Sequence, residues 1–219
     1  MQTLKIGIVG AGIGGLAAAN ALRAAGHEAE VYEQSKQFLR VGADINLTPN
    51  AVHALDGLGE NIAAAARASA ARPTHRISRT WDTGEETSRL PMGDEAERKY
   101  GAPQLTIHRA DLLAALSDAF PTAHVHFAKR AERIDQDAQG VTVRFNDGVE
   151  DRFDALVGAD GIHSVVRHAL FGGEKPRFTG VVAFRAVVPT ARVKDVPNIG
   201  AFTKWWGPTP ESQIVTFPL

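Results

Sequence analysis

A glycine-rich segment near the N-terminus constrains the fold of this chain more than any other feature. Its sequence is Gly10-Ala11-Gly12-Ile13-Gly14-Gly15, which fits the pattern GxGxxG. A short apolar run at residues 5–9 precedes it, helical composition follows at 16–25, and a second short strand is expected at 28–33. A strand, this glycine pattern, a helix and a second strand in that order predict a Rossmann-like site for a dinucleotide.

Each glycine of the motif has a different physical task in such a site. Gly10 permits a tight turn, Gly12 lets the backbone approach a pyrophosphate, and Gly15 lets the helix pack closely on the strand. The start of the helix adds backbone N–H groups and a positive dipole. Glu33 closes the second strand, where its carboxylate can accept hydrogen bonds from ribose hydroxyls and would repel a 2′-phosphate. These residues predict FAD or NAD rather than NADP, and the strand and helix context disfavours a mere glycine-rich turn with a surface Glu.

Composition and charge narrow the class of protein. Of 219 residues, 44% are hydrophobic and 22% are charged, which is typical of a globular protein with a real core. The 24 Lys and Arg residues nearly balance the 25 Asp and Glu residues, which argues against nucleic acid or an anionic membrane as a partner. The chain has no cysteine, no apolar run near the roughly 20 residues that cross a bilayer, and no charged leader after Met1. We therefore expect a cytoplasmic protein.

Beyond the first 71 residues the regular alternation of strand and helix is interrupted. Two strands are expected at 74–81 and 86–90 around a turn, which starts a second structural layer. The pattern then returns to α/β with a strand at 105–108, a helix at 111–120, a hairpin at 141–145 and 149–153, a buried strand at 154–158 and a helix at 164–170. Further strands are expected at 181–188, 201–206 and 213–217.

Two further blocks accompany the glycine motif. They are His108-Arg109-Ala110-Asp111-Leu112 and Gly158-Ala159-Asp160-Gly161-Ile162-His163-Ser164. In this order, over residues 4–170, the three blocks resemble the class A flavoprotein aromatic hydroxylases, the family of salicylate, 3-hydroxybenzoate and 6-hydroxynicotinate monooxygenases. The resemblance implies a discontinuous FAD-binding domain at 1–71 and 101–174 and a β-rich, substrate-side layer at 72–100 and 175–219.

The resemblance also implies cofactor roles for individual residues. Arg109 would reach the FAD phosphates, and Asp160 with Gly161 would help to hold FAD and be associated with NAD(P)H use. Arg40 belongs to a loop similar to the one that runs along the isoalloxazine, and Ala131 is a further implied cofactor contact. Taken alone, Arg109 would more often be a solvated charge at a helix start and Asp160 a helix N-cap. Their occurrence together favours the cofactor roles.

The substrate side departs from the family pattern. Asn46 stands where the 6-hydroxynicotinate enzymes have a His, and an amide cannot act as a general base. Asp44 stands where a small residue is common, and Glu211 and Val215 replace a ring-contacting His and Tyr. Arg185 lies within the strand expected at 181–188, so it either faces solvent or pairs with an anion such as a substrate carboxylate. The sequence identifies no catalytic residue.

The activity implied by the resemblance is hydroxylation of a hydroxylated aromatic or pyridine carboxylate, with NAD(P)H as reductant, O2 as co-substrate and a C4a-hydroperoxyflavin as the oxygen donor. Family members are nearly twice as long and contain a later Gly-Asp motif, so we expect this chain to be an N-terminal portion. Two alternatives remain open at this point. One is an NAD-dependent dehydrogenase, which shares the first β-α-β unit. The other is a flavin-binding module without catalysis, which could form a homodimer through an exposed sheet edge.

Two pairs of residues suggest weaker possibilities. His124 and His126 have zinc-like spacing on an expected strand, but without an evident third ligand or a cysteine we favour a structural pair and predict no metal site. Trp205 and Trp206 are adjacent, and neighbouring strand residues point to opposite faces, so at most one of them would line an aromatic pocket.

Overall fold

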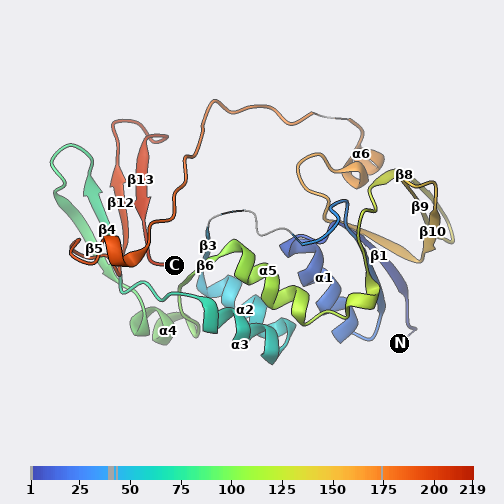
Figure 1. Cartoon of the computed structure of the whole chain (residues 1–219), viewed down its shortest axis with the longest axis horizontal. Coiled ribbons are helices and arrows are strands. Elements are labelled where there is room, and N and C mark those ends of the chain that lie inside the picture. The colour runs from blue at the N-terminus through green and yellow to red at the C-terminus, as the bar shows by residue number, and fades with distance from the viewer. Residues whose placement is uncertain (1, 39–41, 43, 174) are drawn as a thin grey trace. The chain divides into compact units, whose positions relative to one another are not determined.

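The computed structural model describes residues 2–38, 42, 44–173 and 175–219, which form two compact units (Figure 1). Unit 1 comprises Met1–Arg40 and Leu113–Phe178, and unit 2 comprises Val41–Leu112 and Thr179–Leu219. The chain therefore leaves unit 1, builds most of unit 2, and returns to unit 1 before it ends in unit 2. The boundary between Leu112 and Leu113 falls within helix α5, Arg109–Asp118.

Unit 1 is built on a parallel sheet with the strand order β11-β1-β2-β7. The strands are β1 (Lys5–Val9), β2 (Glu28–Tyr32), β7 (Val125–His126) and β11 (Ala155–Gly158), and helix α1 (Ile13–Ala24) joins β1 to β2. Ile8 and Val31 are completely buried because both faces of a parallel sheet are covered. The predicted β-α-β unit is confirmed.

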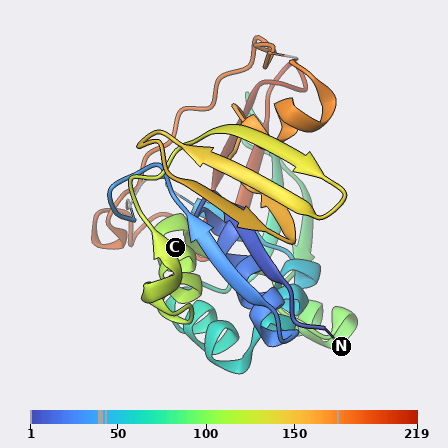
Figure 2. The same cartoon turned by 90° about the vertical axis from the view of Figure 1, so that its right-hand side faces the viewer.

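A second, antiparallel sheet in unit 1 has the order β10-β9-β8 (Figure 2, yellow to orange). Its strands are β8 (Ala131–Asp137), β9 (Gly140–Phe145) and β10 (Glu150–Phe153), so the predicted hairpin is confirmed. Phe145 and Phe153 pack with Tyr32 and with Val166 of helix α6 (Val165–Phe171) in one buried cluster. The Tyr32 and Phe145 rings are stacked with centroids 4.5 Å apart. This cluster attaches the hairpin to the parallel sheet.

Among its described residues, unit 2 contains two sheets and the helices α2, α3 and α4, and it also includes the start of α5. The larger sheet, β13-β12-β4-β5, has a parallel pair between β12 and β4 and antiparallel pairs elsewhere; the smaller is the antiparallel pair of β3 and β6. The elements are β3 (Asp44–Leu47), α2 (Pro49–Leu58), α3 (Glu60–Ser69), β4 (His75–Thr80), β5 (Glu86–Pro91), α4 (Asp94–Tyr100), β6 (Leu105–His108), β12 (Phe202–Trp206) and β13 (Gln213–Thr216). Two 3-10 turns complete the elements of the chain, Thr122–His124 in unit 1 and Thr190–Arg192 in unit 2.

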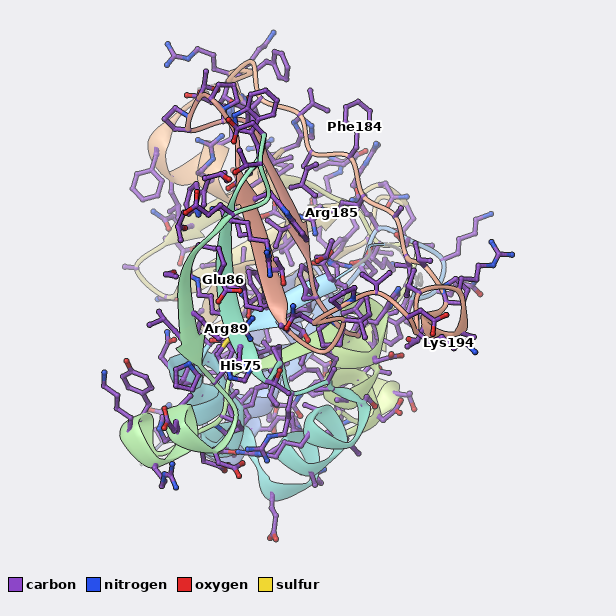
Figure 3. All side chains as sticks on the ribbon, turned by 90° about the vertical axis from the view of Figure 1, so that its left-hand side faces the viewer. His75, Glu86, Arg89, Phe184, Arg185 and Lys194 are labelled. Atoms are coloured by element: carbon purple, nitrogen blue, oxygen red, sulfur yellow. The ribbon has the colours of Figure 1, made fainter. Side chains whose placement is uncertain are left out.

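One predicted element is wrong. Residues 181–188 have the alternating composition of a strand, yet among the described residues they pair with no neighbour and form no strand. Their apolar side chains are exposed, and Phe184 is 96% accessible. A strand needs a neighbour that takes up its backbone hydrogen bonds, and β-propensity alone does not supply one. Arg185 therefore lies on an extended segment without strand pairing (Figure 3).

Within the part of the chain that is described, no helix combines the length and the apolar character needed to cross a bilayer.

Candidate FAD-binding site

The glycine loop between β1 and α1 is closely packed at two of its glycines. Gly10 has a φ of +101°, and a Cβ atom there would lie 2.3 Å from the carbonyl oxygen of Ala159. A Cβ at Gly15 would lie only 1.8 Å from the carbonyl oxygen of Gly10. Any side chain at either position would therefore displace backbone, and these contacts bring the start of α1 close to the end of β1.

The other two glycines of the motif have open space in front of them. Apart from the adjacent residues and the neighbouring backbone of α1 itself, no heavy atom of the described residues lies within 4 Å of a Cβ built at Gly12 or at Gly14. Gly12 is the N-cap of α1 and makes no side-chain cap, so the first turn presents backbone N–H groups that have no acceptor within the helix. A pyrophosphate requires close backbone approach, such N–H donors and the positive end of a helix dipole, and this loop supplies all three.

Glu33 lies directly against the glycine loop. Its Oε2 accepts a hydrogen bond from the Ala11 amide at 2.9 Å, and its Oε1 accepts one from the Ser35 amide at 2.8 Å. Both carboxylate oxygens are thus fixed by backbone donors, which leaves each oxygen a second lone pair for another donor. The arrangement holds a carboxylate directly beside the glycine loop.

Asp160 takes part in the start of helix α6. Its Oδ1 accepts from the Ser164 hydroxyl at 2.5 Å, and its Oδ2 accepts from the amides of Val165 and Val166 at 2.6 and 3.2 Å. Ser164 is the N-cap and accepts from the Arg167 amide at 2.9 Å. Gly161, with a φ of +79°, makes the turn between them. Asp160 therefore fixes the strand-to-helix turn, and we infer that it would act on a cofactor by positioning this turn.

The remaining predicted cofactor residues occupy different settings. Arg109 begins α5 in unit 2, and its side chain lies over Gly42, where a Cβ would come within 2.6 Å of the Arg109 Cδ atom. Ala131 is the first residue of β8 in unit 1 and is buried in the aromatic cluster, so its methyl group packs in the core. Arg40 lies outside the described residues. Asp160, Gly161 and Glu33 belong to unit 1 with the glycine loop.

On the substrate side, the β3–β6 sheet of unit 2 has a polar face. Asn46 lies opposite Thr106, and its Oδ1 accepts a hydrogen bond from the Gln104 amide. Thr106 is completely buried and donates to the Pro218 carbonyl at 2.6 Å. Gln104 and Thr106 were not among the site residues predicted from the sequence, although polar side chains beside the otherwise apolar strand at 105–108 were the available signal.

Arg185 forms an ion pair with Asp44, which is a residue of the same chain rather than a substrate anion. Its Nη1 donates to Asp44 Oδ1 at 2.6 Å, and both residues lie in unit 2. The two residues are 141 positions apart, so their pairing has no local signal in the sequence and each was predicted separately.

The two histidines share one carboxylate, Glu30. His124 Nδ1 and His126 Nε2 each lie 2.7 Å from a different oxygen of Glu30 on strand β2. His126 is on β7, whereas His124 ends the preceding 3-10 turn rather than lying on the strand as predicted. Among the described residues, no three or more His, Cys, Asp or Glu side chains form a group that could hold a metal ion.

Glu30 links the stability of unit 1 to pH. Burial opposes its charge, but hydrogen bonds from His126 and His124 outweigh that effect and lower the pKa of Glu30 below its usual value of 4.5. A carboxyl whose pKa is lowered by folding stabilises the fold above its unfolded pKa, and this contribution is lost as the pH falls through the lower, folded value. We expect Glu30→Gln to reduce the free energy of unfolding at pH 7 by about 1–3 kcal/mol and to flatten its decline below pH 4.5.

Urea unfolding between pH 3 and 7 measures this effect, with Glu28→Gln at the exposed start of the same strand as the matched control. Equal slopes below pH 4.5 for wild type and Glu30→Gln would contradict the role of the shared carboxylate.

The two tryptophans of β12 differ as predicted from the alternation of strand residues. Trp205 lines a cavity of about 510 Å³ in unit 2, together with Trp81, Pro208 and Ile214, whereas Trp206 is not among the residues that line it. Instead, the Lys204 ammonium lies 3.5 Å from the centroid of the Trp206 ring.

Known proteins are similar to this chain in sequence and in fold. The FAD binding domain family matches residues 3–218. The chain is 38% identical to 6-hydroxynicotinate 3-monooxygenase of Bordetella bronchiseptica, over 92% of this chain and 52% of that protein. It is 37% identical to 3-amino-4-hydroxybenzoate 2-monooxygenase of Streptomyces cremeus, over 94% of this chain and 52% of that protein.

Klebsiella pneumoniae HpxO complexed with FAD and uric acid has a similar structure, with a TM-score of 0.80 and 27% identity, over 98% of this chain and 53% of that one. The chain thus spans about half the length of the relatives that it matches. These matches agree with the α/β FAD-binding fold expected from the three sequence blocks and disfavour the dehydrogenase alternative. The chain belongs to the FAD binding domain family, and the relatives that it matches carry the names of monooxygenases.

Proposed function

We propose that the complete protein is an FAD- and NAD(P)H-dependent monooxygenase that hydroxylates a hydroxylated aromatic or pyridine carboxylate. The observation that most supports the proposal is the loop of unit 1, in which open space at Gly12 and Gly14 adjoins the helix α1 N-terminus and the anchored carboxylate of Glu33. The names of the two relatives, a hydroxypyridine carboxylate and an aminohydroxybenzoate monooxygenase, support the substrate class.

The residues of unit 1 would bind and orient the cofactor. The first turn of α1 would donate N–H groups to the pyrophosphate, and Glu33 would accept from the ribose hydroxyls. Asp160 would keep the β11–α6 turn in place through its three hydrogen bonds. FAD, when bound, would supply the oxygen chemistry with NAD(P)H as the reductant, while the protein would supply binding, orientation and exclusion of water.

The complete protein, purified with its flavin, tests this function through oxidation of NADH and NADPH with and without hydroxylated aromatic carboxylates. We expect a substrate to accelerate oxidation and to yield a product with one additional hydroxyl group, identified by mass. A protein that binds flavin but whose NAD(P)H oxidation responds to no such compound would favour a flavin-binding module without catalysis.

Position 46 gives a further prediction. Because Asn46 cannot act as a base, we propose that the substrate arrives as a phenolate or is deprotonated through water or another residue. Asn46→Ala leaves the buried Gln104 amide without its acceptor, so we expect a loss of about 1–3 kcal/mol in the free energy of unfolding. The pH profile of turnover should keep its shape. A profile that lost its basic limb, or turnover abolished with substrate affinity intact, would show that Asn46 participates in proton transfer.

A further inference from the structure

Asp44 and Arg185 place opposite charges side by side on the substrate-side unit. The Asp44 side chain is 17% exposed and the Arg185 side chain is 56% exposed, so the carboxylate is largely enclosed while the guanidinium is accessible. One contact, from Arg185 Nη1 to Asp44 Oδ1 at 2.6 Å, joins them. A guanidinium has five N–H donors, so Arg185 can also meet a ligand anion.

The pair adjoins the polar face of the β3–β6 sheet. Asp44 and Asn46 are two residues apart on β3, so their side chains share one face, and their partners across the sheet are His108 and Thr106. Figure 3 shows Arg185 on the extended segment next to Phe184. Where the Arg185 guanidinium is accessible, a flat ligand would meet both members of the ion pair.

The low exposure of Asp44 determines which ligands the pair would accept. A ligand carboxylate competes with Asp44 for the charge of the guanidinium, because both anions would share one cation. If the ligand brings only a carboxylate, the interaction of Asp44 with Arg185 is weakened in a poorly hydrated position, which is unfavourable. A ligand that also carries an N–H donor replaces what Asp44 loses.

Building on the proposed function, we propose that the Asp44–Arg185 pair selects aromatic acids that carry an N–H donor as well as a carboxylate. Arg185 would bind the carboxylate and Asp44 would accept the N–H of a ring amino group or of a pyridone ring nitrogen. Hydroxybenzoates without such a donor would bind more weakly, because they satisfy only one member of the pair. The two residues would thus determine specificity without taking part in the chemistry.

Three compounds separate the two contacts in the complete, FAD-loaded protein: 3-amino-4-hydroxybenzoate, 4-hydroxybenzoate, which lacks the amino group, and 2-aminophenol, which lacks the carboxylate. Dissociation constants come from the change in flavin absorbance on titration. We expect 3-amino-4-hydroxybenzoate to bind at least about tenfold more tightly than 4-hydroxybenzoate or 2-aminophenol. Each of those two compounds lacks one hydrogen bond to a charged residue.

Variants assign the two preferences to the two residues. In Asp44→Asn and Asp44→Ala, the preference for the amino group should fall to within about twofold while the preference for the carboxylate persists. In Arg185→Gln, the preference for the carboxylate should fall while the preference for the amino group persists. Asp56→Asn breaks a comparable ion pair with Arg67 between α2 and α3 and should change neither preference.

Equal affinities for 3-amino-4-hydroxybenzoate and 4-hydroxybenzoate in the wild type, or an amino preference that survives both Asp44 variants, would overturn the inference while the proposed function stands. The proposed function fails separately if no hydroxylated aromatic carboxylate stimulates NAD(P)H oxidation, and the inference then fails with it.

Discussion

Replacing Gly15 with alanine is expected to destabilise unit 1 by about 3 kcal/mol or more, because the added methyl overlaps a backbone atom that cannot rotate away. The new Cβ would lie 1.8 Å from the Gly10 carbonyl oxygen, so α1 and the end of β1 would have to separate. Urea unfolding of the flavin-free protein measures the loss.

Gly14→Ala is the matched control for this prediction. It is the adjacent residue of the same helix and has no heavy atom within 4 Å of its Cβ position. Since alanine favours a helix over glycine by up to about 1 kcal/mol, this variant should be as stable as the wild type or more stable. Unchanged unfolding of Gly15→Ala would show that the close approach of helix and strand is not required.

Gly12→Ala, in contrast to Gly15→Ala, should leave the stability of the fold unchanged but weaken flavin binding. Gly12 has a φ of −73°, which alanine adopts readily, and its Cβ would enter open space. If that space receives the pyrophosphate, the methyl group would keep the phosphate from the backbone donors and weaken FAD binding by about tenfold to a hundredfold. Fluorescence titration of the flavin-free variant with FAD measures the effect.

If Gly12→Ala bound FAD as tightly as the wild type does, the pyrophosphate would have to lie elsewhere than in front of Gly12. Gly15→Ala and Gly12→Ala together therefore distinguish a glycine that is needed for packing from a glycine that is needed for the ligand.

Local features of the fold could be predicted from the sequence. The glycine loop, the β9–β10 hairpin and helix α6 depend on residues that are close in the chain, such as Ser164 at the start of α6. Their turn and capping chemistry is visible in the sequence itself.

Features that depend on distant partners could not be predicted in this way. Residues 181–188 have the alternation of a strand, but whether a strand forms depends on a neighbour, and the described chain places none beside them. Glu30 meets His126 across 96 positions, and Asp44 meets Arg185 across 141. No spacing rule connects such pairs, so the sequence indicated single residues where the structure shows interactions.

Glu33 is the residue on which the proposed FAD site depends most. Its carboxylate is held by the Ala11 and Ser35 amides beside the glycine loop, where we propose that it binds the FAD ribose. The measurement is the flavin retained after dilution and gel filtration of the purified complete protein, read from the flavin absorbance bands of wild type and Glu33→Gln. We expect a yellow wild-type protein and a variant whose affinity for FAD is about one to two orders of magnitude lower. A colourless wild type that binds NAD instead, or a Glu33→Gln variant with full flavin content, would contradict the proposed FAD site.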